Sequence, residues 1–226
     1  MKFLESVDLE YLNQALTFET SDCKVIGRIE PYSCKQTIGD KKLFKRLEIQ
    51  YVEENSKKKR NFKYKFKEDG HELELKNEIE SEIEMEDNSP MNSFNGSTIS
   101  PFGPINLQSS RKTFFYLIST LNETFPDYDF SRLKHDQFIK TESLQMVMNS
   151  INYTLISAGA QSILNQINLW DHIDFMIQLK DADIYSYVPD LDTDPFAEHG
   201  CIWSFNYFFF NKKLKRIIYF TCRGVR

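Results

Sequence analysis

The chain lacks any hydrophobic run of about 18 residues, which is the length that a membrane-spanning helix needs. Its amino terminus also lacks the basic and then apolar layout of a secretory signal peptide. An excess of basic residues is missing as well, because the net charge is -5 at pH 7. Nucleic-acid binders that act through overall electrostatics normally need a basic domain or a dense basic face. We therefore expect a soluble intracellular protein with no membrane partner.

Cysteine and histidine are scarce, and neither is arranged as a set of metal ligands. The four cysteines form no Cys-x-x-Cys pair, and the four histidines show no ligand spacing. Widely separated cysteines are typical of reduced thiols in a cytosolic or nuclear protein. We expect no metal, no disulfide and no cofactor.

The sequence is instead rich in aromatic residues, with 19 Phe and 11 Tyr among its 226 residues, which is enough for a well-packed core. Apolar residues also recur at helical spacing in several places. This spacing predicts helices that begin at caps Ser6, Asp40 and Ser110, a fourth that carries residues 144–155 and ends at Gly159, and a further stretch that breaks near Asp171.

The segment CIWSFNYFFFNKKLKRIIYFTCR, residues 201–223, predicts a β-hairpin. Aromatic and β-branched residues favour a strand over 202–210, Asn211 supplies a left-handed turn conformation, and residues 217–222 return. Both faces of the first strand are apolar, which is typical of a central strand, so we expect Trp203 to be buried. Further strands are predicted over residues 23–32 and 183–188.

The middle of the chain differs in composition from both ends. Residues 55–109 carry a basic block, then an acidic block, and then many Ser, Asn, Pro and Gly residues, a composition that buries too little apolar surface to offset the entropy of ordering. We expect residues 1–54 and 110–226 to be two parts of one α/β or α+β domain, interrupted by a flexible linker over 55–109. The amino- and carboxy-terminal strands then share one sheet.

Acidic residues gather before the hairpin, with Asp190, Asp192 and Asp194 among them. Pro189 and Pro195 break the register that a calcium loop requires. We interpret this segment as an exposed acidic loop that meets a basic partner, and we expect no catalysis there.

The turn of the hairpin carries Lys212, Lys213 and Lys215, followed by Arg216. Cations beside aromatic residues suit RNA, because aromatic rings stack bases while cations hold phosphates. A solvated turn or a protein-docking tip fits the same residues. Burial of Tyr207 and Phe209 discriminates between these interpretations, because buried rings cannot stack bases.

Three blocks of the sequence together resemble the Maf-one family, the repressors of RNA polymerase III transcription. These blocks are GRIEPYSCK at residues 27–35, SSRKTFFYLISTLNETFPDYDFS at 109–131, and the terminal hairpin, which is preceded by DADIYSYVPDLDTDPFAEHG. The opening MKFLE and LNQALTFETSDCKVIGRIE are also similar to that family. The resemblance implies a central, mostly antiparallel sheet flanked by helices and interrupted by a linker.

The resemblance also implies a function without a chemical step. A family member is expected to bind RNA polymerase III during stress or starvation and to prevent engagement of transcription factor IIIB, so we expect no enzyme. Arg28, Glu30 and Lys35 match a family block and are candidates for partner binding, together with the acidic loop and the basic tip. Two alternatives remain open, an RNA-binding regulator that uses the hairpin and a small-molecule sensor.

Control by phosphorylation is implied as well, with regulatory kinases and phosphatases as partners. Ser81 precedes an acidic residue at the third position, and Ser89 and Ser100 each precede Pro, which makes these three the phosphorylation candidates. No Arg-Arg-x-Ser site occurs, which disfavours control by a basic-directed kinase. Shuttling between nucleus and cytoplasm then needs an import receptor, for which the basic run Lys57, Lys58, Lys59 and Arg60 is the candidate signal.

Overall fold

The computed structural model describes residues 1–49, 51–53, 100–189, 194–197 and 199–226. The chain divides into two compact units, of which one comprises Met1–Phe44 with Ile99–Arg226 and the other comprises Lys45–Thr98. In the second unit, residues 45–49 and 51–53 are helical. The first unit holds the sheet and all the features described below.

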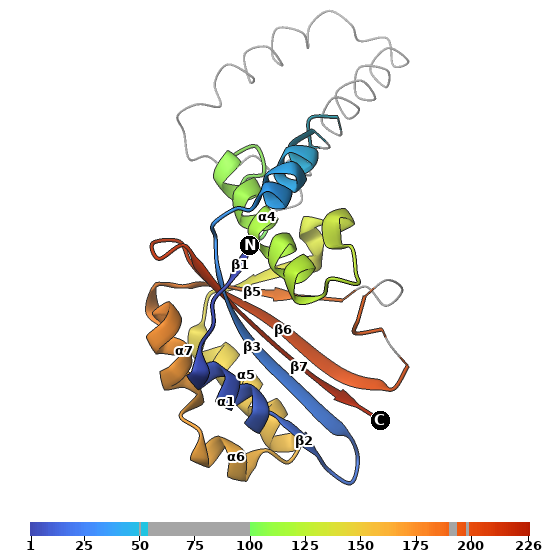
Figure 1. Cartoon of the computed structure of the whole chain (residues 1–226), viewed down its shortest axis with the longest axis vertical. Helices are drawn as coiled ribbons and strands as arrows, with labels where there is room; N and C mark the ends of the chain where they lie inside the picture. The colour runs from blue at the N-terminus through green and yellow to red at the C-terminus, as the bar shows by residue number, and fades with distance from the viewer. Residues whose placement is uncertain (50, 54–99, 190–193, 198) are drawn as a thin grey trace, which may run out of the picture. The chain divides into compact units, whose positions relative to one another are not determined.

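An antiparallel sheet forms the centre of the first unit (Figure 1). Its strand order is β1-β3-β7-β6-β5-β4, and β2 pairs with β3 beside this path. The strands are β1 (Lys2–Phe3), β2 (Thr17–Glu19), β3 (Lys24–Ser33), β4 (Phe138–Thr141), β5 (Asp183–Tyr187), β6 (Cys201–Asn211) and β7 (Arg216–Val225). Because β3 pairs with β7 along its whole length, strands from both ends of the chain share one sheet, as the sequence predicts.

The predicted hairpin is present as β6 and β7, but its turn differs from the expectation. Lys215 has the left-handed backbone, with a φ of 52°, and Asn211 is not among the residues of positive φ. Asn211 is fully buried at the end of β6 instead. Its Nδ2 donates to the carbonyl of Ile177 at 2.8 Å, and its Oδ1 accepts from the Leu214 amide at 3.0 Å. The amide side chain therefore closes the turn by hydrogen bonding.

One face of the sheet is covered by the helices α1 (Val7–Ala15), α5 (Leu144–Ser157), α6 (Gln161–Gln166) and α7 (Leu169–Ile177) (Figure 1). Buried leucines and isoleucines of α1, α5 and α7 pack there against alternate residues of the central strands. Those strand residues include Phe209 and Phe220, which are fully buried. The main hydrophobic core lies between these helices and the sheet.

The opposite face of the sheet packs against α4 (Gln108–Thr124) and short 3-10 turns at Phe130–Arg132 and His135–Gln137. Tyr116 of α4 contacts Phe210 edge to face, and Phe125 contacts Tyr219 in the same way. Phe208 and Tyr219 are stacked with ring centroids 4.6 Å apart. The sheet is therefore central and antiparallel with helices on both faces, which confirms the predicted fold class.

Burial along β6 bears on whether its aromatic rings could stack on RNA bases. Phe209 is fully buried, while Tyr207 is half-buried and packs against the main core. Trp203 is also half-buried, so the expectation of a buried indole was wrong. The reason is position, because β5 pairs with β6 only over Tyr207–Phe210, and among the described residues the first half of β6 has β7 as its one partner strand.

Several predicted helix limits also change. Ser6 caps α1 as predicted, and Gly159 has the positive φ expected after α5. The second helix is capped by Thr37 rather than Asp40, since the Thr37 Oγ1 accepts from the Asp40 amide while the Asp40 carboxylate accepts from the Thr37 amide.

Helix α4 begins at Gln108, before the expected Ser110 cap. The last helical stretch breaks at residues 167–168, ahead of Asp171. In the part of the chain that the structure describes, no helix is both long and apolar enough to cross a membrane.

Candidate functional site

The GRIEPYS block places three polar side chains on the α4 face of β3. Arg28, Glu30 and Tyr32 alternate along the strand, so they point to the same side. The Arg28 guanidinium is paired with Glu30, and the Tyr32 hydroxyl donates to the other Glu30 oxygen at 2.7 Å. Because Tyr32 has a single proton to donate, the Thr124 hydroxyl 2.9 Å away donates to it. This network joins β3 to the carboxyl end of α4.

Burial and charge keep this network in one protonation state. Burial raises the pKa of Tyr32 well above its usual range, and the neighbouring Glu30 carboxylate raises it further. Tyr32 therefore stays protonated and remains a donor at neutral pH. The Arg28 guanidinium also lies 5.7 Å from the centroid of the Phe125 ring, which adds a cation–π contact at the end of α4.

A second polar cluster adjoins the first on β6 and β7. The hydroxyls of Tyr219 and Thr221 both donate to the Oδ1 of Asn206, at 2.6 and 2.8 Å. Arg223 donates to the carbonyl of Pro195 at 2.8 Å, which ties the preceding loop to the sheet. The Asn206 Nδ2 is buried and has no hydrogen-bond partner among the described residues, while the other hydrogen bonds named above join groups within each cluster or to the loop. The chemistry of both clusters is structural, and they contain no nucleophile paired with a base.

The first group of partner-binding candidates divides by exposure. Glu30 is buried with 8% of its surface exposed, whereas the Arg28 side chain is half-buried and Lys35 is exposed. Lys35 lies next to the hairpin tip, because the amide of Cys34 donates to the carbonyl of Lys215 at 2.9 Å. The structure therefore brings Lys35 together with the tip and leaves Glu30 inside the network.

The acidic loop differs from the exposed surface that its composition suggested. Asp194 is buried, with 5% of its surface exposed, and it accepts a hydrogen bond from the Tyr187 hydroxyl. Asp190 and Asp192 lie outside the described residues. The part of the loop that the structure describes therefore holds its carboxylate against the sheet, away from solvent.

The hairpin tip carries exposed cations, and two of them are engaged in ion pairs. Lys212 lies 2.8 Å from Asp183, which also pairs with Lys140 at 3.1 Å, and Lys213 lies 3.2 Å from Asp181. Burial alone raises the pKa of Asp183, but the hydrogen bonds and charges of the two lysines outweigh it and hold this pKa below its usual range. These pairs reduce the positive charge that the tip offers to phosphate groups.

Lys215 and Arg216 are the tip cations that remain outside those two pairs. Lys215 is exposed, and among the described residues no carboxylate pairs with it. The Arg216 guanidinium donates to the carbonyl of Met176 at 3.3 Å. Lys215, together with Lys35, is therefore the most available positive surface on the described part of the chain near the tip.

The regulatory candidates fall mainly beyond what the structure describes. Lys57, Lys58, Lys59, Arg60, Ser81 and Ser89 all lie outside the described residues. Ser100 is buried, with 9% of its surface exposed, and its hydroxyl accepts from the Phe102 amide at 3.3 Å. A kinase needs local opening of this turn to reach the Ser100 hydroxyl.

The cysteines are separate and mostly shielded. Burial raises the pKa of Cys34 and of Cys222 to about 12, so both stay thiols at neutral pH. None of the four cysteines forms a disulfide. Among the described residues, no group of three His, Cys, Asp or Glu side chains is placed to hold a metal ion.

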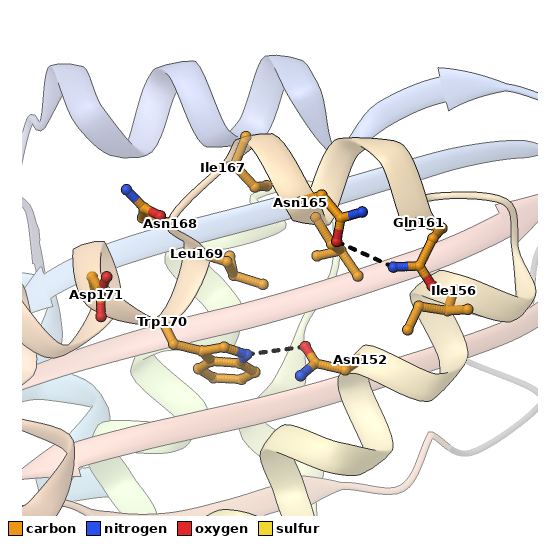
Figure 2. A pocket seen from close by; sticks show the side chains of 10 residues that line it. Asn152, Ile156, Gln161, Asn165, Ile167, Asn168, Leu169, Trp170 and Asp171 are labelled. Carbon is orange, nitrogen blue, oxygen red and sulfur yellow. Dashed lines mark hydrogen bonds between the residues drawn. The ribbon is translucent and has the colours of Figure 1, made fainter.

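A cavity of about 380 Å³ opens between α5, α6 and α7 (Figure 2). Its lining combines apolar residues with the amide side chains of Asn152, Gln161, Asn165 and Asn168. The sequence did not predict this cavity. Helical spacing identifies the buried stripe of each helix, but it does not show where the helices leave a space between one another. One available signal was the absence of charged residues from 143–170.

Comparison with known proteins gives matches along the whole chain. The family model described as Maf1 regulator matches residues 25–221. The chain is 39% identical over 229 residues to a Schizosaccharomyces pombe protein named repressor of RNA polymerase III transcription maf1, covering 100% of this chain and 83% of the relative. It is 38% identical over 237 residues to a Dictyostelium discoideum protein named repressor of RNA polymerase III transcription, with coverage of 100% and 85%.

Solved structures give the same picture of the fold. A crystal structure of citrus MAF1 matches with a TM-score of 0.63 at 28% identity, covering 97% of both chains. A second crystal form of citrus MAF1 matches with a TM-score of 0.60 at 30% identity, covering 96% of this chain and 97% of that one.

Proposed function

Because the chain belongs to the Maf1 regulator family, we propose that it represses transcription by RNA polymerase III. The observation that carries this proposal is similarity over the full chain to two proteins named as such repressors. The similarity is spread over the family model's range of residues 25–221, which takes in both the GRIEPYS block and most of the hairpin. RNA polymerase III is then the target of this chain.

The proposed mechanism is occlusion by binding. The chain docks on the polymerase under stress or starvation and prevents transcription factor IIIB from engaging it, without a chemical step. The polar groups around Glu30 bond with one another and hold the sheet to α4, which supports a structural role for that block. The exposed cations Lys215 of the tip and Lys35 beside it are the surface that we assign to an acidic region of the partner.

Co-purification tests the proposal directly. A tagged full chain is expressed in starved and in fed cells, and RNA polymerase III subunits are measured in the eluate together with the rate of transfer RNA synthesis. We expect the complex in starved cells and reduced transfer RNA synthesis there. Absence of the polymerase from both eluates, with unchanged transfer RNA synthesis, refutes the proposal.

The tip is tested with a matched pair of charge reversals. Lys215→Glu is expected to weaken the complex in a way that depends on ionic strength, because steering by exposed charges is screened by salt. Lys112→Glu reverses an exposed lysine of α4 and serves as the control. If both variants bind equally well at all salt concentrations, the tip is not part of the interface. That result would not refute the proposed repressor function.

Control by location and phosphate is the remaining part of the proposal. Kinases and phosphatases acting on Ser81, Ser89 and Ser100 determine whether the chain resides in the cytoplasm or, through an import receptor that binds the basic run from Lys57 to Arg60, in the nucleus. Replacing all three serines with Ala is expected to keep the protein nuclear and transfer RNA synthesis low in nutrient-rich cells. Unchanged location and synthesis discard these serines as the switch.

A further inference from the structure

Residues 143–170 contain no Asp, Glu, Lys, Arg or His, although charged residues make up 27% of the chain. This stretch forms α5, α6 and the start of α7. Exposed helix faces normally mix Lys, Arg, Glu and Asp, which keep a surface soluble. The cores of protein interfaces are depleted in charge and enriched in Tyr and Met. The uncharged surface of α5 and α6 therefore has the composition of an interface.

The outer face of α5 also exposes large apolar side chains. Met146, Tyr153 and Ile156 are 67%, 74% and 41% exposed. Their spacing of seven and then three residues places them along one face of the helix. Ile156 lines the cavity between α5, α6 and α7, so the apolar stripe runs directly into it.

The cavity has an apolar floor and a rim of amides (Figure 2). Ile167 and Leu169 are buried beneath it. The Trp170 indole donates to Asn152 Oδ1 at 3.0 Å, which fixes the ring and leaves the Asn152 NH₂ as a donor. Gln161 donates to Asn165 at 3.2 Å, which leaves the Gln161 carbonyl as an acceptor.

Asp171 is the one charged residue among those that line the cavity, and it is exposed. A neutral rim with a single carboxylate repels phosphate and attracts one cation. This charge pattern disfavours a nucleic acid. It also disfavours a second copy of the same face, because residues 143–170 of that copy carry no cation to meet Asp171.

We propose that this groove binds an extended peptide segment of a partner protein. One apolar side chain of the peptide fills the cavity, and its main-chain amide and carbonyl groups hydrogen-bond with Gln161 and Asn152. A Lys or Arg next to that apolar residue pairs with Asp171. A peptide suits the site because its main chain presents a donor and an acceptor together, and because the apolar stripe on α5 extends beyond the cavity. The proposal is independent of the polymerase and of the hairpin tip.

The probe is a display library of short random peptides panned against the full chain. Selected sequences are synthesised with a fluorescent label, and their dissociation constants are measured by anisotropy. We expect the selected peptides to share an apolar residue beside Lys or Arg. We also expect Ile156→Glu and Asp171→Lys each to weaken binding by about tenfold or more, the size of effect seen for a central interface contact.

Matched variants separate binding from folding. Asp127→Lys reverses an exposed carboxylate on the turn after α4, outside the groove. Gln108→Ala removes an exposed amide at the start of α4, on the opposite face of the sheet, and Asn165→Ala removes an amide from the groove. Only the groove variants should lose affinity. A peptide with Glu in place of its basic residue should regain binding to Asp171→Lys, which shows that this variant is folded.

Three outcomes overturn the proposal. If the selected peptides bind Ile156→Glu and Asp171→Lys as tightly as they bind the unchanged protein, their binding site lies outside the groove. If no selected peptide carries an apolar residue next to Lys or Arg, the groove does not recognise the pair of residues that we propose. A concentration-dependent dimer that Ile156→Glu abolishes, without peptide binding, assigns the face to a second copy of the chain.

Discussion

At the scale of single residues, Trp203 shows how a side chain can be structural without being buried. It lies directly opposite Gly224 in the β6–β7 ladder, and a Cβ added to Gly224 would meet the indole nitrogen at 2.4 Å. The indole therefore occupies the space that the glycine leaves on the neighbouring strand. This pairing explains why a strand of high β-propensity contains a glycine at this position.

Gly224→Ala is accordingly expected to lower the free energy of unfolding by about 1–3 kcal/mol, because the new methyl group displaces the indole. In a Trp203→Ala background the same substitution should cost much less, since its steric cause is gone. Denaturant unfolding of the two single variants and the double variant measures this coupling. Equal costs in both backgrounds would show that the contact is not responsible.

Two buried thiols give a second residue-scale prediction. Cys34 and Cys222 have pKa values raised from 9.0 to about 12 by burial. The unfolded chain loses these protons first, so the stability they contribute is complete below pH 9 and declines as the pH rises toward 12. Each thiol steepens the decline by up to about 1.4 kcal/mol per pH unit. Urea unfolding in a pH series checks this, and Cys34→Ala should reduce the slope; an unchanged slope contradicts the assignment.

At the scale of elements, the hairpin tip combines two lysines in ion pairs with one that stands outside them. Lys212→Glu replaces an attraction to Asp183 with a repulsion, and Asp183 is only partly exposed. We expect a loss of about 1 kcal/mol or more. Lys215→Glu should change stability by less than about 0.5 kcal/mol, because it breaks no described pair. Thermal unfolding measures the stability of both variants. Equal losses of stability would show that the Lys212–Asp183 ion pair contributes nothing.

The elements also show what the sequence can and cannot predict. Helix α5 and its Gly159 end are predictable because periodicity and a positive φ act locally. Strand β4, at Phe138–Thr141, is too short to show a pattern and exists only because β5 offers it a partner. Asn211 was misassigned for a similar reason, since its role depends on the carbonyl of Ile177 in α7.

The candidate site was only partly predictable on the same grounds. The residues Arg28, Glu30 and Tyr32 are visible in the sequence as a block, but the hydrogen bond from Thr124 to Tyr32 spans 92 positions. Composition suggested an exposed acidic loop, whereas Asp194 is folded under and bonded to Tyr187. Burial of this kind depends on tertiary packing, which no local pattern encodes.

At the scale of the whole molecule, the two ends of the chain depend on one another for a sheet. The ladder between β3 and β7 runs from Lys24 opposite Val225 to Ser33 opposite Arg216. Leu12 of α1 and Leu16, which caps that helix, join the same core as Phe209 and Phe220 of the carboxy-terminal strands. Neither part alone buries these side chains, so their association should not require a continuous chain.

This dependence gives a prediction for a cleaved protein. A specific protease site placed between residues 54 and 99 is cut after purification, and the product is analysed by size-exclusion chromatography and thermal unfolding. The two fragments should elute together and unfold in a single transition, because separating them exposes both sides of the β3–β7 ladder and the α1 side of the core. An intact chain with the same insertion, left uncut, controls for the inserted site. Fragments that elute separately under native conditions would contradict the expectation that residues 1–54 and 110–226 are two parts of one domain.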